Sequence, residues 1–300
     1  MKFYIVDAFS EKIFGGNPAG IVLLGDGAEF PENDVMLSTA AELRYSETAF
    51  IKQISGNEFE FKYFTPASEV DFCGHATVAA FTALMKCGQA EKNNSYLIRT
   101  LSGDLTIDLT YDSILMGMPA SKLIKRITSR EEIDELYGSL GIVHEPVTVT
   151  DCENSTVELL PILISTGFPD IIMPVKDRET LANIAPDFTA LSDLTEKHGA
   201  GGAHAFTLEA PEEDITACCR NFAPLYGIDE EAATGTASGG LAYYLFIHGL
   251  APSGHDCRFL QGEAMGRPSK IIASVDVCDE TVLIRVGGKG AILAEGEIYI

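Results

Sequence analysis

The stretch VDFCGHATVAAF, residues 70–81, joins a polar, turn-forming segment to a run of small and apolar residues. From Ala76 to Cys87 this run is apolar around the whole circumference of a helix, and it stops at Gly88, a residue typical of helix C-termini. A helix that is apolar on every side must be buried on every side. We therefore expect residues 76–87 to form a central helix around which its domain is built.

A second segment has the same properties. Residues 237–248 are apolar all round and end at Gly249. The segments on either side of both helices are short runs of β-branched and aromatic residues, such as EFEFKYF at 58–64, which predict strands. Strands that surround one buried helix must curl around it. The sequence therefore predicts an α+β fold with two barrel-like, mostly antiparallel sheets, each wrapped around a central apolar helix.

Four motifs of the first half return in the second half in the same order. The pairs are GNPAGIVLL (16–24) and GFPDIIMPV (167–175), ETAFI (47–51) and AHAFTL (203–208), FTP (64–66) and FAP (222–224), and FCGHATVAAF (72–81) and ATGTASGGLAYY (233–244). Ordered echoes of this kind indicate a duplication. We expect two similar domains, residues 1–125 and 126–300, related by a pseudo-twofold axis. Which domain holds the last strand, GEIYI, stays open.

Length and composition agree with a folded protein of two domains. The chain has 300 residues, of which 46% are hydrophobic and 22% charged, as in ordinary globular proteins. Its formal charge of −23 would repel phosphate backbones and anionic lipids, and its Lys and Arg residues are scattered. Nucleic acid and membrane partners are therefore disfavoured.

The cysteines and the N-terminal segment indicate a cytoplasmic location. The seven cysteines include no C-x-x-C pair, which argues against a disulfide framework and fits a reducing compartment. The segment MKFYIVDAF lacks the apolar core of a signal peptide. No apolar run approaches the length of about 18 residues that a membrane span needs.

Each of the two buried helices begins at a glycine, Gly74 in one half and Gly235 in the other, followed by His75 and Thr236. Glycine lets a ligand approach the backbone, and the free N–H groups of a helix start carry about half a positive charge. Such an end can bind a carboxylate without a basic side chain. If the halves face each other, the two ends converge on one cleft that suits a small organic acid.

Cys73 and His75 allow several interpretations. A thiolate at a helix start is stabilised, so Cys73 can act as acid, base or nucleophile. A racemisation by two thiols would need a second cysteine where Thr234 stands. A metal site would need spaced third and fourth ligands, which the sequence does not offer. His75 stays open between a structural or substrate-binding histidine and a proton-transfer group.

Glu47 is the candidate general base. It starts the motif ETAFI, and the echo aligns it with Ala203, so this carboxylate breaks the internal symmetry. We expect burial to raise its pKa toward neutrality, as proton transfer at carbon requires. Glu230 and Glu231 precede the second helix, and one of them can hold a substrate amine or hydroxyl.

At these residues the chain resembles the PhzF-like family of phenazine-biosynthesis isomerases, within the group that has the diaminopimelate epimerase fold. The likeness covers VDAF with GGNPAGIV, YSETAFI, FTPASEVDFCGHAT and FAPLYGIDEEAATGTASG. It implies a biosynthetic isomerase, usually a homodimer, that needs no metal and no organic cofactor. Glu47 would be the acid/base. The substrate-binding residues would be Cys73, Gly74, His75, Glu231, Gly235 and Thr236, with a small-molecule carboxylate as substrate.

One motif departs from the family pattern. Where the family commonly has E-D-P-A-T-G-S-A, residues 230–237 are EEAATGTA. Glutamate in place of aspartate lengthens the side chain by a methylene, about 1.5 Å, which is enough to slow a well-positioned step. The phenazine substrate is therefore not assigned. Two alternatives stay open: an enzyme that depends on the Cys73 thiol, and a non-catalytic protein that binds a small acid.

Overall fold

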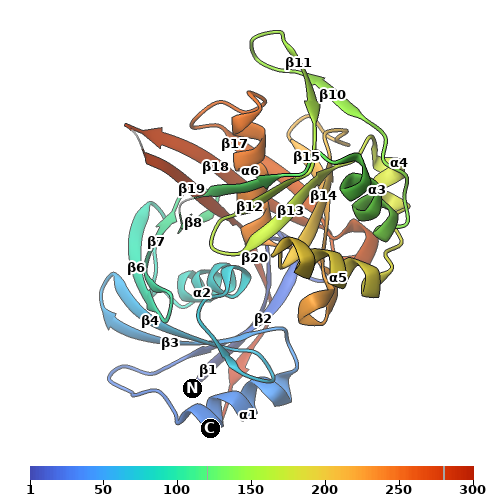
Figure 1. Ribbon diagram of the computed structural model, residues 1–300. Coiled ribbons are helices and arrows are strands. Elements are labelled where there is room, and N and C mark those ends of the chain that lie inside the picture. Colours follow the sequence, from blue (N-terminus) through green and yellow to red (C-terminus); the bar gives the residue numbers. More distant parts are fainter. Residues whose placement is uncertain (120, 280) are drawn as a thin grey trace. The chain divides into compact units, whose positions relative to one another are not determined.

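The computed structural model describes residues 1–119, 121–279 and 281–300 and separates two compact units (Figure 1). The first unit is Met1–Gly117 with Gly287–Ile300, and the second is Met118–Val286. The division lies earlier than the predicted boundary at 125/126, because the strand Lys122–Arg126 pairs with the strand Ile162–Ser165 of the second unit.

The first unit is a mixed sheet with two helices. Its elements are β1 (Lys2–Ala8), β2 (Asn17–Leu23), α1 (Asn33–Leu43), β3 (Thr48–Ser55), β4 (Glu58–Phe64), β5 (Glu69–Val70), α2 (Gly74–Lys86), β6 (Asn94–Thr100), β7 (Gly103–Leu109), β8 (Ile114–Met118) and β20 (Gly290–Glu297). The neighbours in the sheet are β20, β1, β2, β3, β4, β6, β7 and β8, with β5 also on β4. The pairs β2–β3 and β4–β6 are parallel and the others antiparallel.

The chain termini meet in this first unit. β20 pairs with β1 along its length, and the N-terminal ammonium of Met1 donates to the carbonyl of Ile298 at 2.9 Å. Figure 1 accordingly shows the N and C labels side by side. The last strand therefore belongs with the first unit, which answers the question that the sequence left open.

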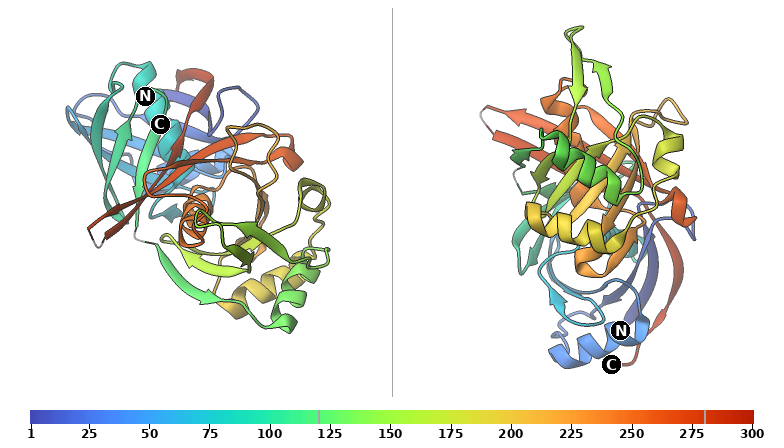
Figure 2. Two further views of the ribbon diagram at one scale, coloured as in Figure 1. Left: turned by 90° about the horizontal axis from the view of Figure 1, so that it is seen from above. Right: turned by 45° about the vertical axis from the view of Figure 1, so that its right-hand side comes forward.

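The second unit is also a mixed sheet. Its elements are β9 (Lys122–Arg126), α3 (Arg130–Ser139), β10 (Val147–Thr150), β11 (Thr156–Leu159), β12 (Ile162–Ser165), β13 (Pro169–Pro174), α4 (Arg178–Ala182), α5 (Phe188–His198), β14 (Gly202–Thr207), β15 (Ala217–Ala223), β16 (Ile228–Glu231), α6 (Gly235–Ile247), β17 (Asp256–Gln261), β18 (Ser269–Cys278) and β19 (Thr281–Gly288). Short 3-10 turns occupy Pro224–Tyr226 and Glu263–Met265. β10 and β11 form a separate hairpin, which stands clear of the unit's sheet in Figure 2.

The strand order of the second unit repeats that of the first. β9, β12, β13, β14, β15, β17 and β18 are neighbours in that order, with β16 also on β15. In both units the third and the fifth pairs of neighbouring strands in this order are parallel. In the second unit these pairs are β13–β14 and β15–β17, and the other pairs are antiparallel. The central helix follows the short strand in both units. The predicted duplication is thus visible in the topology of each unit.

The register of the pairings aligns the two repeats residue by residue. Gly20 is opposite Thr48 in β2–β3, and Ile171 is opposite Ala203 in β13–β14. The amide of Leu24 donates to Ile51 at 2.9 Å, and the amide of Val175 donates to Phe206 at 2.7 Å. When Pro18 is matched with Pro169, the strand register and the two hydrogen bonds both align residue 48 with residue 203. Glu47 therefore corresponds to Gly202, and the predicted match with Ala203 is wrong by one residue.

α2 is buried on all sides, as predicted. It contacts β1, β2, β3 and β20, while its Phe81 packs on Phe59 and Phe61 of β4 and on Tyr96 of β6, with ring centroids 5.5–6.0 Å apart. The Tyr63 hydroxyl lies 2.7 Å from the Thr77 hydroxyl. The sheet therefore surrounds this helix, and the burial of one helix fixes where its first turn lies.

α6 is enclosed in the same way in the second unit. It contacts β12, β13 and β18. A β-carbon at Gly239 would lie 3.0 Å from Val286, and one at Gly240 would lie 3.4 Å from Ile172. Glycine here lets the helix approach the sheet closely. Closure of each sheet into a barrel, and a pseudo-twofold relation between the repeats, stay predictions.

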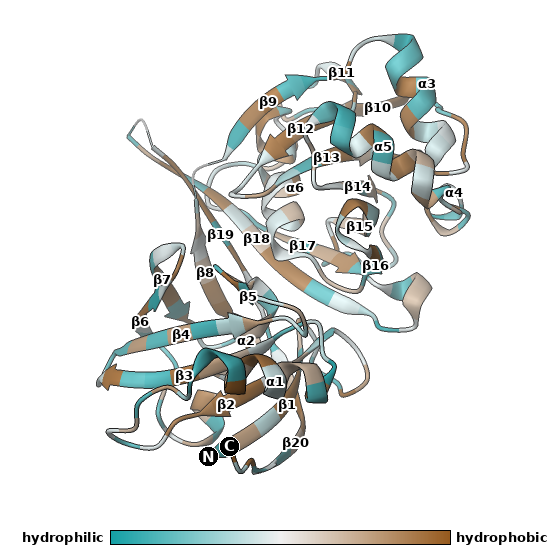
Figure 3. Ribbon diagram, turned by 60° about the horizontal axis from the view of Figure 1, so that its bottom comes forward, coloured by the Kyte–Doolittle hydropathy of each residue, from teal (hydrophilic) through white to brown (hydrophobic). Residues whose placement is uncertain are grey.

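The second unit differs from the prediction of a sheet with one helix. The charged stretch before residue 140 forms α3, which begins at the N-cap Ser129, and α4 and α5 follow it. The three helices bury Ile133, Leu136, Tyr137, Leu181 and Leu191 in a common apolar cluster. In Figure 3 α3 and α5 carry both teal and brown bands, as amphipathic surface helices do. The sequence did not predict these helices, because their charged residues mask the apolar stripe on one face.

Most of the motif GGNPAG belongs to a strand. Residues Asn17 to Gly20 continue β2, because each is paired with β1, and the bend falls at Gly16. Gly16 has φ +63°, and a β-carbon there would lie 2.1 Å from the Ala8 carbonyl oxygen.

In the part of the chain that the structure describes, no helix has the length and apolar character of a membrane span.

The burial of Phe81 gives a direct test of the helix-centred fold. Phe81→Ala should lower the free energy of unfolding by about 3–5 kcal/mol, because it removes a fully buried ring and leaves a cavity. Phe14→Ala is the matched control, since this ring is 64% exposed, and should change stability by less than about 0.5 kcal/mol. Urea denaturation measures both. Equal effects of the two substitutions would contradict the central position of α2.

Candidate active site

Three reactive side chains of the first unit come together at the start of α2. The carboxylate oxygen Oε2 of Glu47 lies 3.1 Å from Nε2 of His75, and Sγ of Cys73 lies 3.4 Å from Nδ1 of the same ring. One ligand atom from each residue lies within 4.8 Å of the other two. Cys73 and His75 are buried and the Glu47 side chain is 19% exposed, so the cluster is enclosed but reaches the surface at Glu47.

The backbone explains why Glu47 arrives at this position. α1 ends at Arg44, which adopts the left-handed conformation with φ +60°, and a short turn leads into β3. The Glu47 carbonyl accepts a hydrogen bond from the amide of Gly20 at 3.2 Å, which joins it to β2. Glu47 therefore stands directly before β3, a strand that packs on α2.

Asn17 and Thr77 support the cluster from two sides. Nδ2 of the buried Asn17 lies 3.4 Å from Nδ1 of His75, so the ring lies between an amide and a carboxylate. The Thr77 hydroxyl donates to the Cys73 carbonyl at 2.8 Å. Asn17 was not predicted as a site residue. Its place beside His75 follows from the strand pairing, which the sequence motif GGNPAG does not reveal.

The pKa of Glu47 departs from the expectation. Burial raises this pKa, but the charge of His75 and the close approach of His75 and Cys73 lower it, and the net pKa lies below the ordinary value of 4.5. The predicted rise toward neutrality is therefore wrong, because the sequence did not place an imidazole against the carboxylate. Glu47 is ionised at neutral pH.

His75 complements Glu47. Burial lowers the pKa of His75, whereas Cys73 and Glu47 raise it, and the net pKa lies well above the ordinary value of 6.5. Burial and the Glu47 charge raise the pKa of the Cys73 thiol. The Glu47 carboxylate is therefore ionised at neutral pH, and its charge favours the protonated form of the His75 ring.

The cluster also has the donor types of a metal site. Cysteine, histidine and glutamate are zinc ligands, and three of them with one water complete a tetrahedron. Binding would require Cys73 to lose its proton and His75 to lose one as well, and the pKa of each is raised. The sequence did not indicate that Glu47 lies close enough to Cys73 and His75 to be a third metal ligand. The prediction of a metal-free site is kept, because the ion pair already satisfies the imidazole.

Gly74 leaves room at the helix start. A β-carbon there would meet Met116 at 3.5 Å, an ordinary contact, and the residue does not have a positive φ. The fold of the first unit therefore does not itself require glycine at position 74. That Gly74 leaves space for a ligand against the N–H groups stays a prediction.

The second unit carries a different set of groups at the start of α6. The Thr234 hydroxyl donates to Glu231 Oε2 at 2.8 Å, and Gln261 Nε2 donates to the Glu231 carbonyl at 2.7 Å and lies 3.1 Å from the Thr234 hydroxyl. Gly235 and Thr236 form the first turn. Gln261 was not predicted, because it comes from β17, far along the chain. A hydroxyl held by hydrogen bonds takes the place that a second catalytic thiol would need.

Glu230 and Glu231 have separate roles. Glu230 accepts two hydrogen bonds from Arg220, both at 2.8 Å, and Arg220 Nη1 donates to backbone carbonyls that include Ile184 at 2.8 Å. The side chains of Glu230 and Arg220 are at least 85% buried. Glu230 is therefore a structural partner of a buried arginine.

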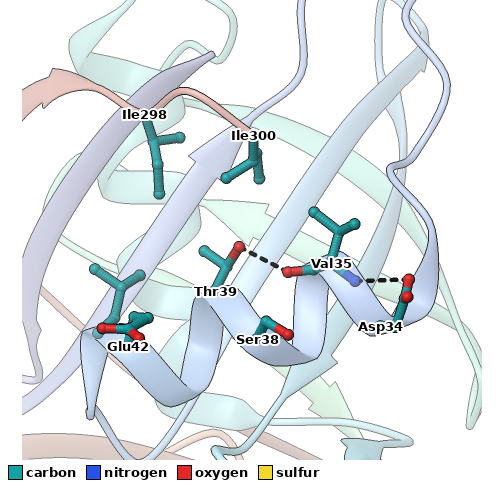
Figure 4. A pocket seen from close by; sticks show the side chains of 8 residues that line it. Asp34, Val35, Ser38, Thr39, Glu42, Ile298 and Ile300 are labelled. Atoms are coloured by element: carbon teal, nitrogen blue, oxygen red, sulfur yellow. Dashed lines mark hydrogen bonds between the residues drawn. The ribbon is translucent and has the colours of Figure 1, made fainter.

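A hollow of about 390 Å³ lies elsewhere in the first unit, away from these residues. It is formed by α1 and the end of the chain, with Val35, Thr39, Ile298 and Ile300 in its wall (Figure 4). Its carboxylates, Asp34 and Glu42, face solvent and none of the cluster residues lines it. This hollow is therefore separate from the cluster of Glu47, Cys73 and His75.

Comparison with known proteins gives relatives that match from end to end. Residues 6–296 match the family model described as phenazine biosynthesis-like protein (PhzC-PhzF). An uncharacterized isomerase of Clostridium acetobutylicum is 31% identical over 308 residues, with 100% of this chain and 98% of that protein covered. The trans-2,3-dihydro-3-hydroxyanthranilate isomerase of Pseudomonas fluorescens is 27% identical, with 100% and 99% covered.

The fold has a close counterpart among solved structures. The crystal structure of a Bacillus anthracis phenazine biosynthesis protein of the PhzF family superposes with a TM-score of 0.84 at 29% identity, and the match covers 100% of this chain and 99% of that one. The resemblance seen in the sequence motifs is thus confirmed over the whole chain, and this protein belongs to the PhzC-PhzF family of phenazine biosynthesis-like proteins.

Proposed function

We propose that this protein is an isomerase that moves a proton at carbon in a small carboxylate-bearing metabolite, without a metal or an organic cofactor. The observation that carries the proposal is the ionised carboxylate of Glu47, held 3.1 Å from the buried ring of His75 at a helix start. Relatives that are named isomerases, one of them acting on trans-2,3-dihydro-3-hydroxyanthranilate, support the class of reaction.

In the proposed mechanism Glu47 is the base. Its carboxylate takes a proton from a substrate C–H bond, and the bonding electrons pass into an enolate-like system that ends on the substrate carboxyl group. The free N–H groups at the start of α2 stabilise that charge. Glu47, now protonated, returns the proton to another carbon and is a carboxylate again. The His75 imidazolium keeps Glu47 ionised and oriented between turnovers.

The second unit would contribute binding groups. We propose that Glu231 holds a substrate amine or hydroxyl, and that the N–H groups at Gly235 and Thr236 bind the substrate carboxylate together with those at Gly74 and His75. This part requires the two helix starts to face one cleft, which remains a proposal. A homodimer in the cytoplasm, without nucleic acid or membrane partners, stays our prediction for the working enzyme.

The Cys73 alternative is less well supported. A thiol nucleophile or base must be a thiolate, and burial together with the Glu47 charge raises the pKa of this thiol. In the second unit the matching position is Thr234, whose hydroxyl is already hydrogen-bonded to Glu231. Cys73 is therefore proposed to pack against the substrate and to support His75.

Replacement of the base tests the central claim. The wild type should introduce solvent deuterium at carbon into trans-2,3-dihydro-3-hydroxyanthranilate or a cyclic amino acid, as measured by mass spectrometry. Glu47→Gln should reduce the rate at least about 100-fold, the usual contribution of a general base. Glu42→Gln, on the exposed side of α1, should leave it unchanged. Exchange that persists in Glu47→Gln would exclude Glu47 as the base.

The role of His75 gives a pH dependence with a defined sign. Glu47 must be ionised to act, so the wild-type kcat/KM should fall only below about pH 4.5, because the pKa of Glu47 lies under that value. In His75→Asn the charge that lowers this pKa is lost and burial remains. The acid limb should then move up by about one pH unit or more. An unchanged acid limb would show that His75 does not control Glu47.

The thiol hypothesis has its own discriminating variant. Cys73→Ser keeps a small polar side chain beside His75 but removes the thiol. Deuterium exchange in this variant should stay within about tenfold of the wild type, since a supporting contact is worth about 1 kcal/mol. Loss of exchange to the level of Glu47→Gln, together with substrate protection of Cys73 against iodoacetamide in the wild type, would favour a Cys-dependent enzyme instead.

A further inference from the structure

An aromatic ring in the second unit is accommodated by a glycine and has no part in the mechanism above. Phe168 directly precedes β13, and its ring lies against the backbone of Gly201. A β-carbon at Gly201 would lie only 2.0 Å from Cζ of Phe168. Gly201 does not have a positive φ, so its backbone conformation does not call for glycine. Glycine at position 201 therefore makes room for this ring.

The ring of Phe168 has a second aromatic neighbour and remains accessible to solvent. The ring of Tyr226, in the turn Pro224–Tyr226, has its centroid 5.3 Å from that of Phe168, and the two planes are inclined by 59°. Tyr226 is 59% exposed and Phe168 is partly exposed, whereas Phe206 and Phe222 of the same unit are fully buried. Phe168 is therefore held in place without being part of the closed core.

The connection that carries Phe168 runs past the start of α6. It joins β12 to β13, and the hydroxyl of its Thr166 donates to the carbonyl of Thr236 at 2.9 Å. Thr236 belongs to the first turn of α6. Phe168 follows Thr166 by two residues, so it stands near the helix end where the free N–H groups lie.

The register of the repeats gives Phe168 a counterpart in the first unit. When Pro18 is matched with Pro169, Phe168 corresponds to Asn17. The side chain of Asn17 lies 3.4 Å from the ring of His75, within the cluster of the first unit. The second unit therefore carries an aromatic ring where the first unit carries a polar group of its site.

Gly201 has a matching place as well. Gly202 corresponds to Glu47, because Thr48 and Ala203 occupy equivalent positions in the two sheets. Gly201 directly precedes Gly202, so the ring of Phe168 packs beside the position that holds the base in the first unit. At both matching positions the second unit thus replaces polar chemistry with an apolar surface.

We propose that Phe168 is a substrate-binding residue that determines specificity, and that its ring packs against a flat, unsaturated part of the substrate whose carboxylate is held at the helix start. The proposal rests on the proposed function and adds the feature of the substrate that the second unit selects. Aromatic rings prefer offset or edge-to-face contacts with other π systems, which stabilise a complex beyond the area that they bury. A saturated skeleton gains from burial alone.

The proposed reaction requires a substrate of this shape. Return of the proton to a different carbon needs a double bond that connects the position of abstraction with the position of return. The atoms that share the charge lie in one plane, and an aromatic side chain is suited to such a plane. Phe168 neither gives nor takes a proton, and its contribution is to bind and orient the conjugated atoms.

Tryptophan fluorescence tests the contact without turnover. The chain has no tryptophan, so Phe168→Trp introduces a single reporter. Benzoate, a carboxylate on a flat ring, should change the emission of this variant in a saturable way. Phe246→Trp is the matched control, because Phe246 is also partly buried against a tyrosine, Tyr243, but lies in the last turn of α6. No response of Phe168→Trp, or an equal response of both variants, would contradict the contact.

Binding affinities test whether the ring itself is recognised. Phe168→Leu keeps an apolar side chain and should raise the Kd for benzoate, measured by calorimetry, about two- to tenfold. The Kd for cyclohexanecarboxylate, which has no π system, should change less, and Phe246→Leu should behave as the wild type. Equal losses for the two acids in Phe168→Leu, or an unchanged Kd for benzoate, would overturn the proposal.

Gly201→Ala reaches the same contact from the other side. The atom that a β-carbon would meet is the free end of the Phe168 side chain, so the ring should move while the backbone keeps its course. The Kd for benzoate should therefore rise as in Phe168→Leu. The double variant Gly201→Ala with Phe168→Leu should lose no more affinity than the larger of the two single losses. Additive losses would show that Gly201 does not act through the ring.

Turnover separates this proposal from the proposed function. If both hold, Phe168→Leu raises the KM for trans-2,3-dihydro-3-hydroxyanthranilate and keeps deuterium exchange at saturating substrate, whereas Glu47→Gln loses exchange and still binds benzoate. A normal KM in Phe168→Leu together with loss of exchange in Glu47→Gln would reject the aromatic contact and keep the base. Weaker benzoate binding in Phe168→Leu with exchange that is independent of Glu47 would do the reverse.

Discussion

The burial of a helix that is apolar on every side is the constraint on which the rest of each unit depends. Once α2 is surrounded by the sheet, its first turn can lie only where strands end, and Cys73, Gly74 and His75 are carried to that place. The same holds for Thr234, Gly235 and Thr236 on α6. Backbone N–H groups that no helix bond satisfies are then held in an enclosed site, where they favour an anion.

The two repeats provide two such sites. The sites differ because the repeats carry different side chains at matching positions. In the first unit a carboxylate and an imidazole stabilise each other's charges at 3.1 Å. In the second, the matching positions are Gly202 and Thr236, so neither the carboxylate nor the imidazole is repeated there. The same architecture can therefore carry different chemistry in the two units, because the side chains at the helix start, and not the sheet, decide which charges are stabilised there.

Much of the fold could be predicted from the sequence. The all-round apolar patterns indicated the two central helices, and the four echoed motifs indicated the repeated topology. The prediction failed where packing outweighs local pattern. The charges of residues 130–139 hid the apolar stripe of α3, and the motif GGNPAG did not show that Asn17 of β2 is paired with Ala8 of β1.

The sequence by itself determined the two buried helices, their glycine starts, the family, and Glu47 as the unmatched acid. Only the tertiary structure decided which charges face one another: His75 against Glu47, and Arg220 against Glu230. It also moved the counterpart of Glu47 from Ala203 to Gly202. The physical reason is that burial patterns depend on neighbours along the chain, whereas the ionisation of a side chain depends on groups a few ångströms away that come from distant strands.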